Sequence, residues 1–193
     1  MSNLFTGSSR GFLASKLRKH INGTSFDYGN VLQINETRHF ENLFHFAGPS
    51  DRDDFKNSRK VVETIVNGTI NMLDIAMRHH SKFIFASTLG VETPDNTYCY
   101  SKLLMEKYIE SMYDNYIILR IPRVYSKCRT KGLMKQIREN TISEADMNKS
   151  VSYITLNDFI EQTLTALKHT KTTFNYNLTN HRTIREIKQW VEK

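Results

Sequence analysis

The sequence is poor in several residue types, and each shortage argues against a class of protein. It has two cysteines, Cys99 and Cys128, and neither lies at a spacing typical of a disulfide framework or a metal site. Only three prolines occur in 193 residues, and we find no linker or low-complexity tract. Apolar runs stay far shorter than a membrane span, and the N-terminus lacks a signal-peptide pattern. We therefore expect one cytoplasmic domain with reduced thiols and no metal.

Basic residues are in excess. Lys and Arg number 27 against 20 acidic residues, which gives a formal net charge of +7. This sign favours an anionic partner, for which nucleotide phosphates and nucleic acid are both candidates. The basic residues are spread along the chain and are not interleaved with aromatic residues in one tract, so nucleic acid is the less favoured partner.

Segments with strand and helix patterns alternate from the N-terminus to Leu119. The alternation predicts an α/β fold: a Rossmann-type doubly wound parallel sheet with a small C-terminal cap. We expect a single domain over residues 1–193, with the cap elements mainly in 123–193. Expected strands are Asn3–Thr6, Ser25–Tyr28, Val31–Ile34, one within Glu41–Gly48, Phe83–Phe85, Tyr116–Ile121, Val151–Ile154 and Asn175–Leu178. Helical patterns cover Leu13–Ile21, Val62–Ala76, the stretch from Tyr98, Leu156–Leu167 and the residues after a capping box at Thr183–Glu186.

The stretch Phe83–Lys107 holds the main candidates for chemistry. Its apolar strand ends on two hydroxyls, Ser87 and Thr88. A loop follows, and then a helix on which Tyr98 and Lys102 share one face because they are four residues apart. The Lys ammonium can favour ionisation of the Tyr phenol for general acid–base work, and a strand hydroxyl could hydrogen-bond the reacting oxygen.

A glycine-rich turn follows the first strand. Gly7, Gly11 and the small Ala14 stand in the order that lets a strand–turn–helix unit bind a pyrophosphate. Arg10 precedes the second glycine, where its guanidinium would suit the 2′-phosphate of NADP. An acidic residue at the end of the second strand would favour NAD instead, and Asp27 is the candidate for that role. Cofactor choice therefore leans toward NADP, with NAD as the alternative.

Several motifs together resemble the extended short-chain dehydrogenase/reductases, the NAD-dependent epimerase/dehydratase group that acts on nucleotide sugars. They are T-G-x-x-x-G-F-L-A at Thr6–Ala14, H-F-A-G at His45–Gly48, N-G-T-I-N-M-L at Asn67–Leu73, F-I-F-A-S-T, Y-x-x-x-K, L-R-I-P-R-V-Y at Leu119–Tyr125 and Y-N-L-T-N at Tyr176–Asn180. The resemblance covers nearly the whole chain in the family's order. The region after Tyr125 is shorter than the family's usual substrate domain, so the chain looks like a shortened member.

The resemblance implies roles for individual residues. Tyr98 would be the catalytic acid/base, Lys102 its partner that also holds the nicotinamide ribose, and Thr88 the hydroxyl that binds the reacting oxygen. Substrate contacts would come from Ser87 and from Arg123, which stands where many members have an Asn that meets the substrate's diphosphate. The cofactor would be bound by Lys102, by residues of the glycine loop and by the small residues at the end of the strand expected within Glu41–Gly48. Apart from Lys102, these residues are Gly7, Ser9, Arg10, Gly11, Phe12, Ala47 and Gly48.

Two matters stay open in the sequence. The net reaction could be reduction, epimerisation or dehydration, and a dehydratase would need a further acid/base pair for which the loop offers Glu92 and Asp95. A non-catalytic dinucleotide-binding sensor or RNA-binding module is the alternative function on the same fold. The resemblance also implies a homodimer, against which a monomeric mass in sedimentation would count.

Overall fold

The structure is a computed structural model that describes residues 2–9, 11–26, 31–32, 36, 38–49 and 57–192. Its strands are β1 (Asn3–Thr6), β2 (Thr24–Phe26), β3 (Asn42–His45), β4 (Lys82–Thr88), β5 (Tyr116–Ile121), β6 (Val124–Tyr125), β7 (Ser150–Thr155), β8 (Thr172–Asn175) and β9 (Asn180–Thr183). Its α-helices are α1 (Phe12–Leu17), α2 (Ser58–Val62), α3 (Gly68–Arg78), α4 (Thr97–Met112), α5 (Leu133–Arg138), α6 (Glu144–Met147), α7 (Leu156–Ala166) and α8 (Ile184–Glu192). A π-helical turn, Glu63–Asn67, joins α2 to α3. Within the described ranges, no helix is both long and apolar enough to cross a membrane.

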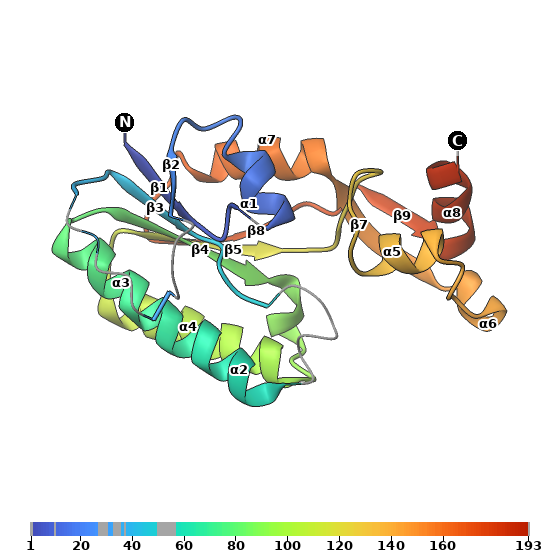
Figure 1. The fold of residues 1–193 in the computed structure, drawn as a ribbon, viewed down its shortest axis with the longest axis horizontal. Helices are drawn as coiled ribbons and strands as arrows, with labels where there is room; N and C mark the ends of the chain where they lie inside the picture. Colours follow the sequence, from blue (N-terminus) through green and yellow to red (C-terminus); the bar gives the residue numbers. More distant parts are fainter. Residues whose placement is uncertain are drawn as a thin grey trace.

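The main sheet has six strands in the order β2-β1-β3-β4-β5-β8, and every pair is parallel. Because each parallel connection must cross the sheet, helices cover both of its faces. Figure 1 shows α1 and α7 over one face and α2, α3 and α4 over the other. This arrangement confirms the predicted doubly wound Rossmann-type sheet.

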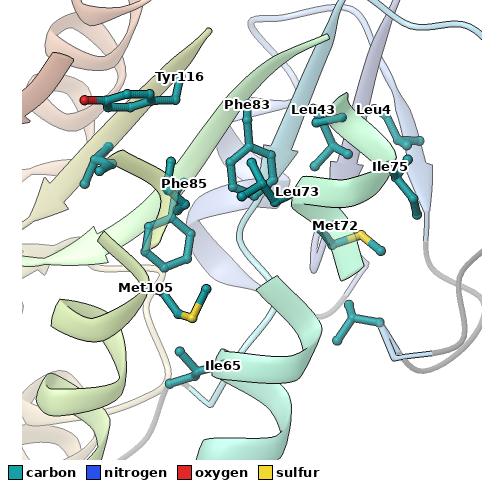
Figure 2. Packing of buried hydrophobic residues seen from close by; sticks show 14 of the residues in the cluster. Leu4, Leu43, Ile65, Met72, Leu73, Ile75, Phe83, Phe85, Met105 and Tyr116 are labelled. Carbon is teal, nitrogen blue, oxygen red and sulfur yellow. The ribbon is translucent and has the colours of Figure 1, made fainter. Parts of the chain in front are cut away.

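Alternate residues of the central strands feed two separate cores. Phe83 and Phe85 of β4 point to the side of α3 and α4, where Met105 is 1% exposed (Figure 2). Ile84, between them, points to the opposite face and packs in the cluster that contains Phe159 of α7. The near-continuous apolar sequence of β4 and β5 is therefore explained by burial on both faces, as expected for central parallel strands.

The C-terminal part forms a second, smaller unit beside the sheet (Figure 1). Strands β6, β7 and β9 make a three-stranded sheet, in which β6 and β7 are parallel and β7 and β9 antiparallel. Its own apolar cluster includes Tyr125 and Tyr153, whose rings stack with centroids 4.6 Å apart, and Ile187 of α8. Helix α8 begins at the predicted capping box, in which Glu186 accepts from the Thr183 amide and Thr183 Oγ1 accepts from the Glu186 amide.

Three expected elements differ from the sequence-based prediction. Val31 and Leu32, expected in a strand, form a turn, and Gln33 and Ile34 lie outside the described residues. The Val31 carbonyl accepts a hydrogen bond from the Asn71 side chain at 2.7 Å, and the Val31 side chain packs on Gly68. The carbonyl that a strand would pair with a neighbouring strand is therefore bonded to α3.

The other two differences concern element ends. Helix α1 ends at Leu17, well before Ile21. The chain turns back early because Asn22 and Gly23 press against β1, where the Asn22 carbonyl accepts from Asn3 Nδ2 at 2.6 Å. The last parallel strand is three residues early, at Thr172–Asn175, because Tyr176 turns inward to pair its hydroxyl with Thr163 at 2.7 Å.

Apolar side chains remain on the outer surface of α4 and its neighbours. Leu104 is 57% exposed and Met112 is 49% exposed, and Val62 and Ile70 of α2 and α3 are also exposed. A second copy of the chain would cover such a face, so the expected homodimer stays a prediction.

Candidate active site

The carboxyl ends of β1, β3, β4 and β5 meet at one edge of the sheet, since these strands are parallel and in register. Gly7 follows β1, Ala47 lies just after β3, and Thr88 ends β4. Ligands of open α/β sheets bind at this edge. The topology therefore brings together the glycine turn, the small residues after His45 and the hydroxyl-tipped strand, which are far apart in the sequence.

Gly7 and Gly11 are required by close backbone contacts. Gly7 has φ +75°, and a Cβ there would lie 2.8 Å from the amide nitrogen of Ala47. The Gly11 amide donates to the Gly7 carbonyl at 3.0 Å, and a Cβ on Gly11 would come much too close to that carbonyl oxygen. Only glycines let the turn fold this tightly against the end of β3, and the resulting cradle fits the predicted dinucleotide.

The remaining predicted cofactor residues lie around this turn. Ser9 is exposed, Phe12 is half-buried as the first residue of α1, and Gly48 is exposed beyond Ala47. The Ser8 hydroxyl pairs with that of Ser25, which ties the turn to β2. Arg10 and Asp27, the residues on which the NADP or NAD choice turns, lie outside the described residues.

We expect Gly7→Ala to weaken both folding and NADPH binding. The left-handed φ alone costs about 1–2 kcal/mol for a residue with a Cβ, and the contact with the Ala47 backbone adds to this cost. Gly132→Ala is the matched control, because Gly132 also has positive φ (+61°) but a Cβ there meets nothing within 4 Å. Urea unfolding and an NADPH titration check the pair. Equal losses of stability and unchanged NADPH affinity in both variants would contradict the contact argument.

A buried histidine fixes the edge beside the glycine turn. His45 is fully buried, its Nδ1 lies 2.8 Å from Thr6 Oγ1, and its Nε2 lies 3.1 Å from Thr69 Oγ1. Thr6 Oγ1 also accepts from the Ala47 amide at 3.4 Å. Burial lowers the pKa of His45 to about 3, so the ring is neutral and serves as a hydrogen-bonding bridge. The bridge connects β1, β3 and α3 around Ala47.

Tyr98 and Lys102 lie at the start of α4, which Asn96 caps by accepting from the Cys99 amide at 3.0 Å. Lys102 is 4% exposed; its Nζ donates to the Ala86 carbonyl at 2.7 Å and lies 5.9 Å from the centre of the Tyr98 ring. The helix therefore brings both side chains to one side, as the four-residue spacing predicted, and Lys102 reaches the Ala86 carbonyl of β4.

Burial sets the protonation of this pair in the ligand-free protein. Burial raises the pKa of Tyr98 to about 12, and the Arg129 guanidinium acts in the opposite direction by favouring the phenolate. Burial also lowers the pKa of Lys102 to about 7, against which the Glu106 carboxylate raises it. Arg129 is thus a second cation that acts on Tyr98, beside Lys102, whose ammonium donates to the Ala86 carbonyl of β4.

The two hydroxyls at the end of β4 have different surroundings. Thr88 is half-buried, and its Oγ1 accepts from the Gly90 amide at 3.3 Å. Ser87 is 3% exposed and donates to Glu106 Oε1 at 2.5 Å, so its hydroxyl is engaged inside the protein. This contact favours a supporting role for Ser87 over substrate binding. Arg123 is exposed and follows β5.

Sequence reasoning did not single out Arg129 or Glu106. Arg129 Nη1 donates to the Val124 carbonyl at 2.7 Å, and its Cζ lies 5.8 Å from the centre of the Phe12 ring, which joins the C-terminal unit to the glycine turn. In the sequence, Arg129 is one of several basic residues in the same segment, and no pattern distinguishes it from the others. Glu106 lies four residues after Lys102, a spacing that placed it on the same helix face. The described residues contain no group of His, Cys, Asp and Glu side chains that could hold a metal.

Solved structures share this fold over nearly the whole chain. One is ADP-L-glycero-D-manno-heptose-6-epimerase from Helicobacter pylori: identity is 22%, the TM-score is 0.81, and the match covers 99% of this chain and 81% of that one. Another is RMD from Pseudomonas aeruginosa complexed with NADPH, with 15% identity, a TM-score of 0.79 and coverage of 98% and 80%. UDP-glucose 4-epimerase from Thermotoga maritima, solved with UDP-glucose, has 19% identity, a TM-score of 0.77 and coverage of 100% and 82%.

The sequence itself settles the family. A comparison with curated proteins finds no match. The model of the NAD-dependent epimerase/dehydratase family, however, matches residues 6–179, which span both the glycine turn and the Tyr98–Lys102 helix. The chain therefore belongs to the NAD-dependent epimerase/dehydratase family.

Proposed function

We propose that this protein is an NAD(P)-dependent oxidoreductase of the epimerase/dehydratase type that acts on an activated sugar, a nucleotide sugar. The observation that carries the proposal is the pairing of Tyr98 with buried Lys102 on α4, where Lys102 is bonded to Ala86 of the strand that ends at Thr88. The glycine turn lies at the same sheet edge and fits a dinucleotide. NADPH in RMD and UDP-glucose in the Thermotoga epimerase support the ligand classes.

Each residue has a distinct task in this proposal. NAD(P), when bound, accepts or supplies the hydride. With its pKa at about 12, the Tyr98 phenol is protonated at neutral pH and donates its proton to the oxygen of a carbonyl substrate. In the reverse direction the phenolate takes the proton of the substrate hydroxyl. Thr88 hydrogen-bonds that oxygen, and Lys102 and Arg129 stabilise the negative charge on Tyr98.

The C-terminal unit formed by β6, β7, β9 and α8 is the proposed substrate cap. This unit follows directly from β5, whose carboxyl end lies at the same sheet edge as the glycine turn, and it carries Arg123 and Arg129. Contact of Arg129 with the Phe12 ring places part of this unit against the glycine turn. A cation in this position suits a substrate that carries a diphosphate.

Measuring turnover of a panel of nucleotide sugars and 4-keto nucleotide sugars with NADPH and NADH tests the proposal. We expect turnover of at least one sugar. If the product is a dehydrated sugar, loss of its formation in Glu92→Gln or Asp95→Asn would identify that carboxylate as the further acid/base group. Both loop carboxylates are exposed. Absence of turnover together with salt-sensitive RNA binding would instead favour the non-catalytic RNA-binding module.

Cofactor choice is tested with Arg10. If its guanidinium binds the 2′-phosphate, Arg10→Ala should reduce NADPH affinity by roughly 10-fold or more, as expected for loss of a charge-assisted hydrogen bond. NADH affinity should be unchanged. Arg18→Ala removes an exposed guanidinium at the far end of α1 and is the matched control. Equal NADPH affinities in wild type and Arg10→Ala would show that Arg10 does not select the cofactor.

A further inference from the structure

A completely buried carboxylate lies one helical turn beyond Lys102. Glu106 of α4 is 0% exposed, although a buried charge is costly unless it is paired and hydrogen-bonded. None of the roles proposed above uses this residue. Its burial so close to the Tyr98–Lys102 pair therefore needs an explanation.

Two adjacent strands supply the partners of Glu106. Arg120 of β5 donates through Nη2 to Oε2 at 2.7 Å and through Nε to both carboxylate oxygens at 3.1 and 3.2 Å. Ser87 of β4 donates to Oε1 at 2.5 Å. Ser87 and Arg120 are direct neighbours in the β4–β5 register. The carboxylate is therefore held in a single position, and both of its oxygens are occupied.

Glu106 is connected to all three proposed catalytic residues through its helix and through Ser87. It shares the buried face of α4 with Lys102, which in turn lies against the Tyr98 ring. Through Ser87 it holds the end of β4 immediately before Thr88. Removal of the carboxylate would thus affect the charge near Lys102 and the anchoring of the strand end together.

We propose that Glu106 is a positioning residue of this site: its fixed carboxylate favours the ammonium form of Lys102, and its bond to Ser87 fixes the strand end that carries Thr88. The proposed catalytic benefit rests on the function proposed above. The electrostatic part concerns Lys102 alone and can be measured without cofactor or substrate.

The charged groups around Lys102 support this assignment. Burial pushes the pKa of Lys102 down to about 7, and Glu106 is the group that raises it. His45, which faces Lys102 from β3, is neutral because burial holds its own pKa at about 3. Tyr98 on α4 is protonated at neutral pH, and Arg120 on β5 is bound to Glu106 itself. Among the described groups named here, Glu106 is therefore the one that favours the ammonium form of Lys102.

The titration of Lys102 tests the proposal. The side-chain Hε/Cε signal of Lys102 is followed by NMR across pH in the full-length protein and identified by its loss in Lys102→Met. Glu106→Gln keeps the size and one acceptor of the side chain but removes its charge. We expect it to lower the titration midpoint of Lys102 by about one pH unit or more, the size of effect that a nearby opposite charge produces.

Glu110→Gln is the matched control, because Glu110 lies one turn further along α4 and pairs with the exposed Lys107 at 2.8 Å. It should leave the Lys102 midpoint unchanged. A folded Glu106→Gln protein with the wild-type midpoint would overturn the proposal. If Glu106→Gln fails to fold because the half-buried Arg120 is left without its counter-charge, the double variant Glu106→Gln/Arg120→Gln replaces it. Its Lys102 midpoint is then compared with that of Arg120→Gln alone, and equal midpoints in these two proteins would overturn the proposal.

Turnover separates this proposal from the proposed function. If the enzyme turns over a nucleotide sugar, Glu106→Gln should move the Lys102-dependent limb of the kcat pH profile by the same amount as the NMR midpoint. A purely structural role would lower kcat without moving that limb, and this result would also overturn the proposal. If no substrate is turned over while the NMR midpoint shifts, the proposed function fails and the Glu106–Lys102 coupling stands.

Discussion

Tyr98→Phe is expected to reduce turnover by a factor of about 10²–10⁴, the usual contribution of a positioned general acid or base. The substitution removes one hydroxyl and keeps the aromatic ring that packs against the Lys102 side of the core. Affinity for NADPH should be nearly unchanged, because the proposed binding contacts lie in the glycine turn and at Lys102. The loss should therefore appear in kcat.

Tyr100→Phe is the matched control for this variant. Tyr100 lies on the same helix two residues later, but its side chain is 58% exposed. The same chemical change there should leave kcat, NADPH affinity and thermal stability at wild-type values. Steady-state kinetics with the accepted sugar, together with NADPH titration, measures both variants. Wild-type turnover in Tyr98→Phe would remove this residue from the mechanism.

The sequence was sufficient for those features that depend on local patterns. Apolar runs and helix spacing predicted the parallel sheet, and the glycine turn was placed correctly after β1 because its glycines follow a strand directly. The four-residue spacing of Tyr98 and Lys102 predicted that both would point to the same side of a helix. These inferences need no knowledge of distant parts of the chain.

Features that depend on distant partners could not be predicted in this way. Glu106 follows Lys102 at a spacing that usually indicates an exposed ion pair on a helix. Its burial depends on Arg120, which belongs to the next strand. The electrostatic role of Arg129 requires the C-terminal unit to contact the glycine turn. In the same way, Val31 has a strand-like pattern but gives its carbonyl to Asn71 of α3.

Lys102 should make the folded protein less stable at neutral pH than at alkaline pH. Its pKa falls from 10.5 to about 7 on folding, because burial disfavours the ammonium. Between these two pH values the unfolded chain binds more protons than the folded protein, so the free energy of unfolding rises with pH. The shift corresponds to at most roughly 5 kcal/mol, since each pKa unit is worth about 1.4 kcal/mol.

Lys102→Met should therefore stabilise the protein while it abolishes turnover. The variant loses the hydrogen bond to Ala86, worth about 1 kcal/mol, but no longer buries an ammonium. We expect its free energy of unfolding at about pH 6 to exceed that of wild type by roughly 3 kcal/mol, with the gap closing near pH 10. Lys107→Met on the exposed face of the same helix should change stability by less than about 1 kcal/mol at either pH. Urea unfolding of the three proteins at both pH values measures these differences. If the gap between wild type and Lys102→Met is the same at both pH values, Lys102 keeps its ordinary pKa in the folded protein, and the argument that burial lowers this pKa is wrong.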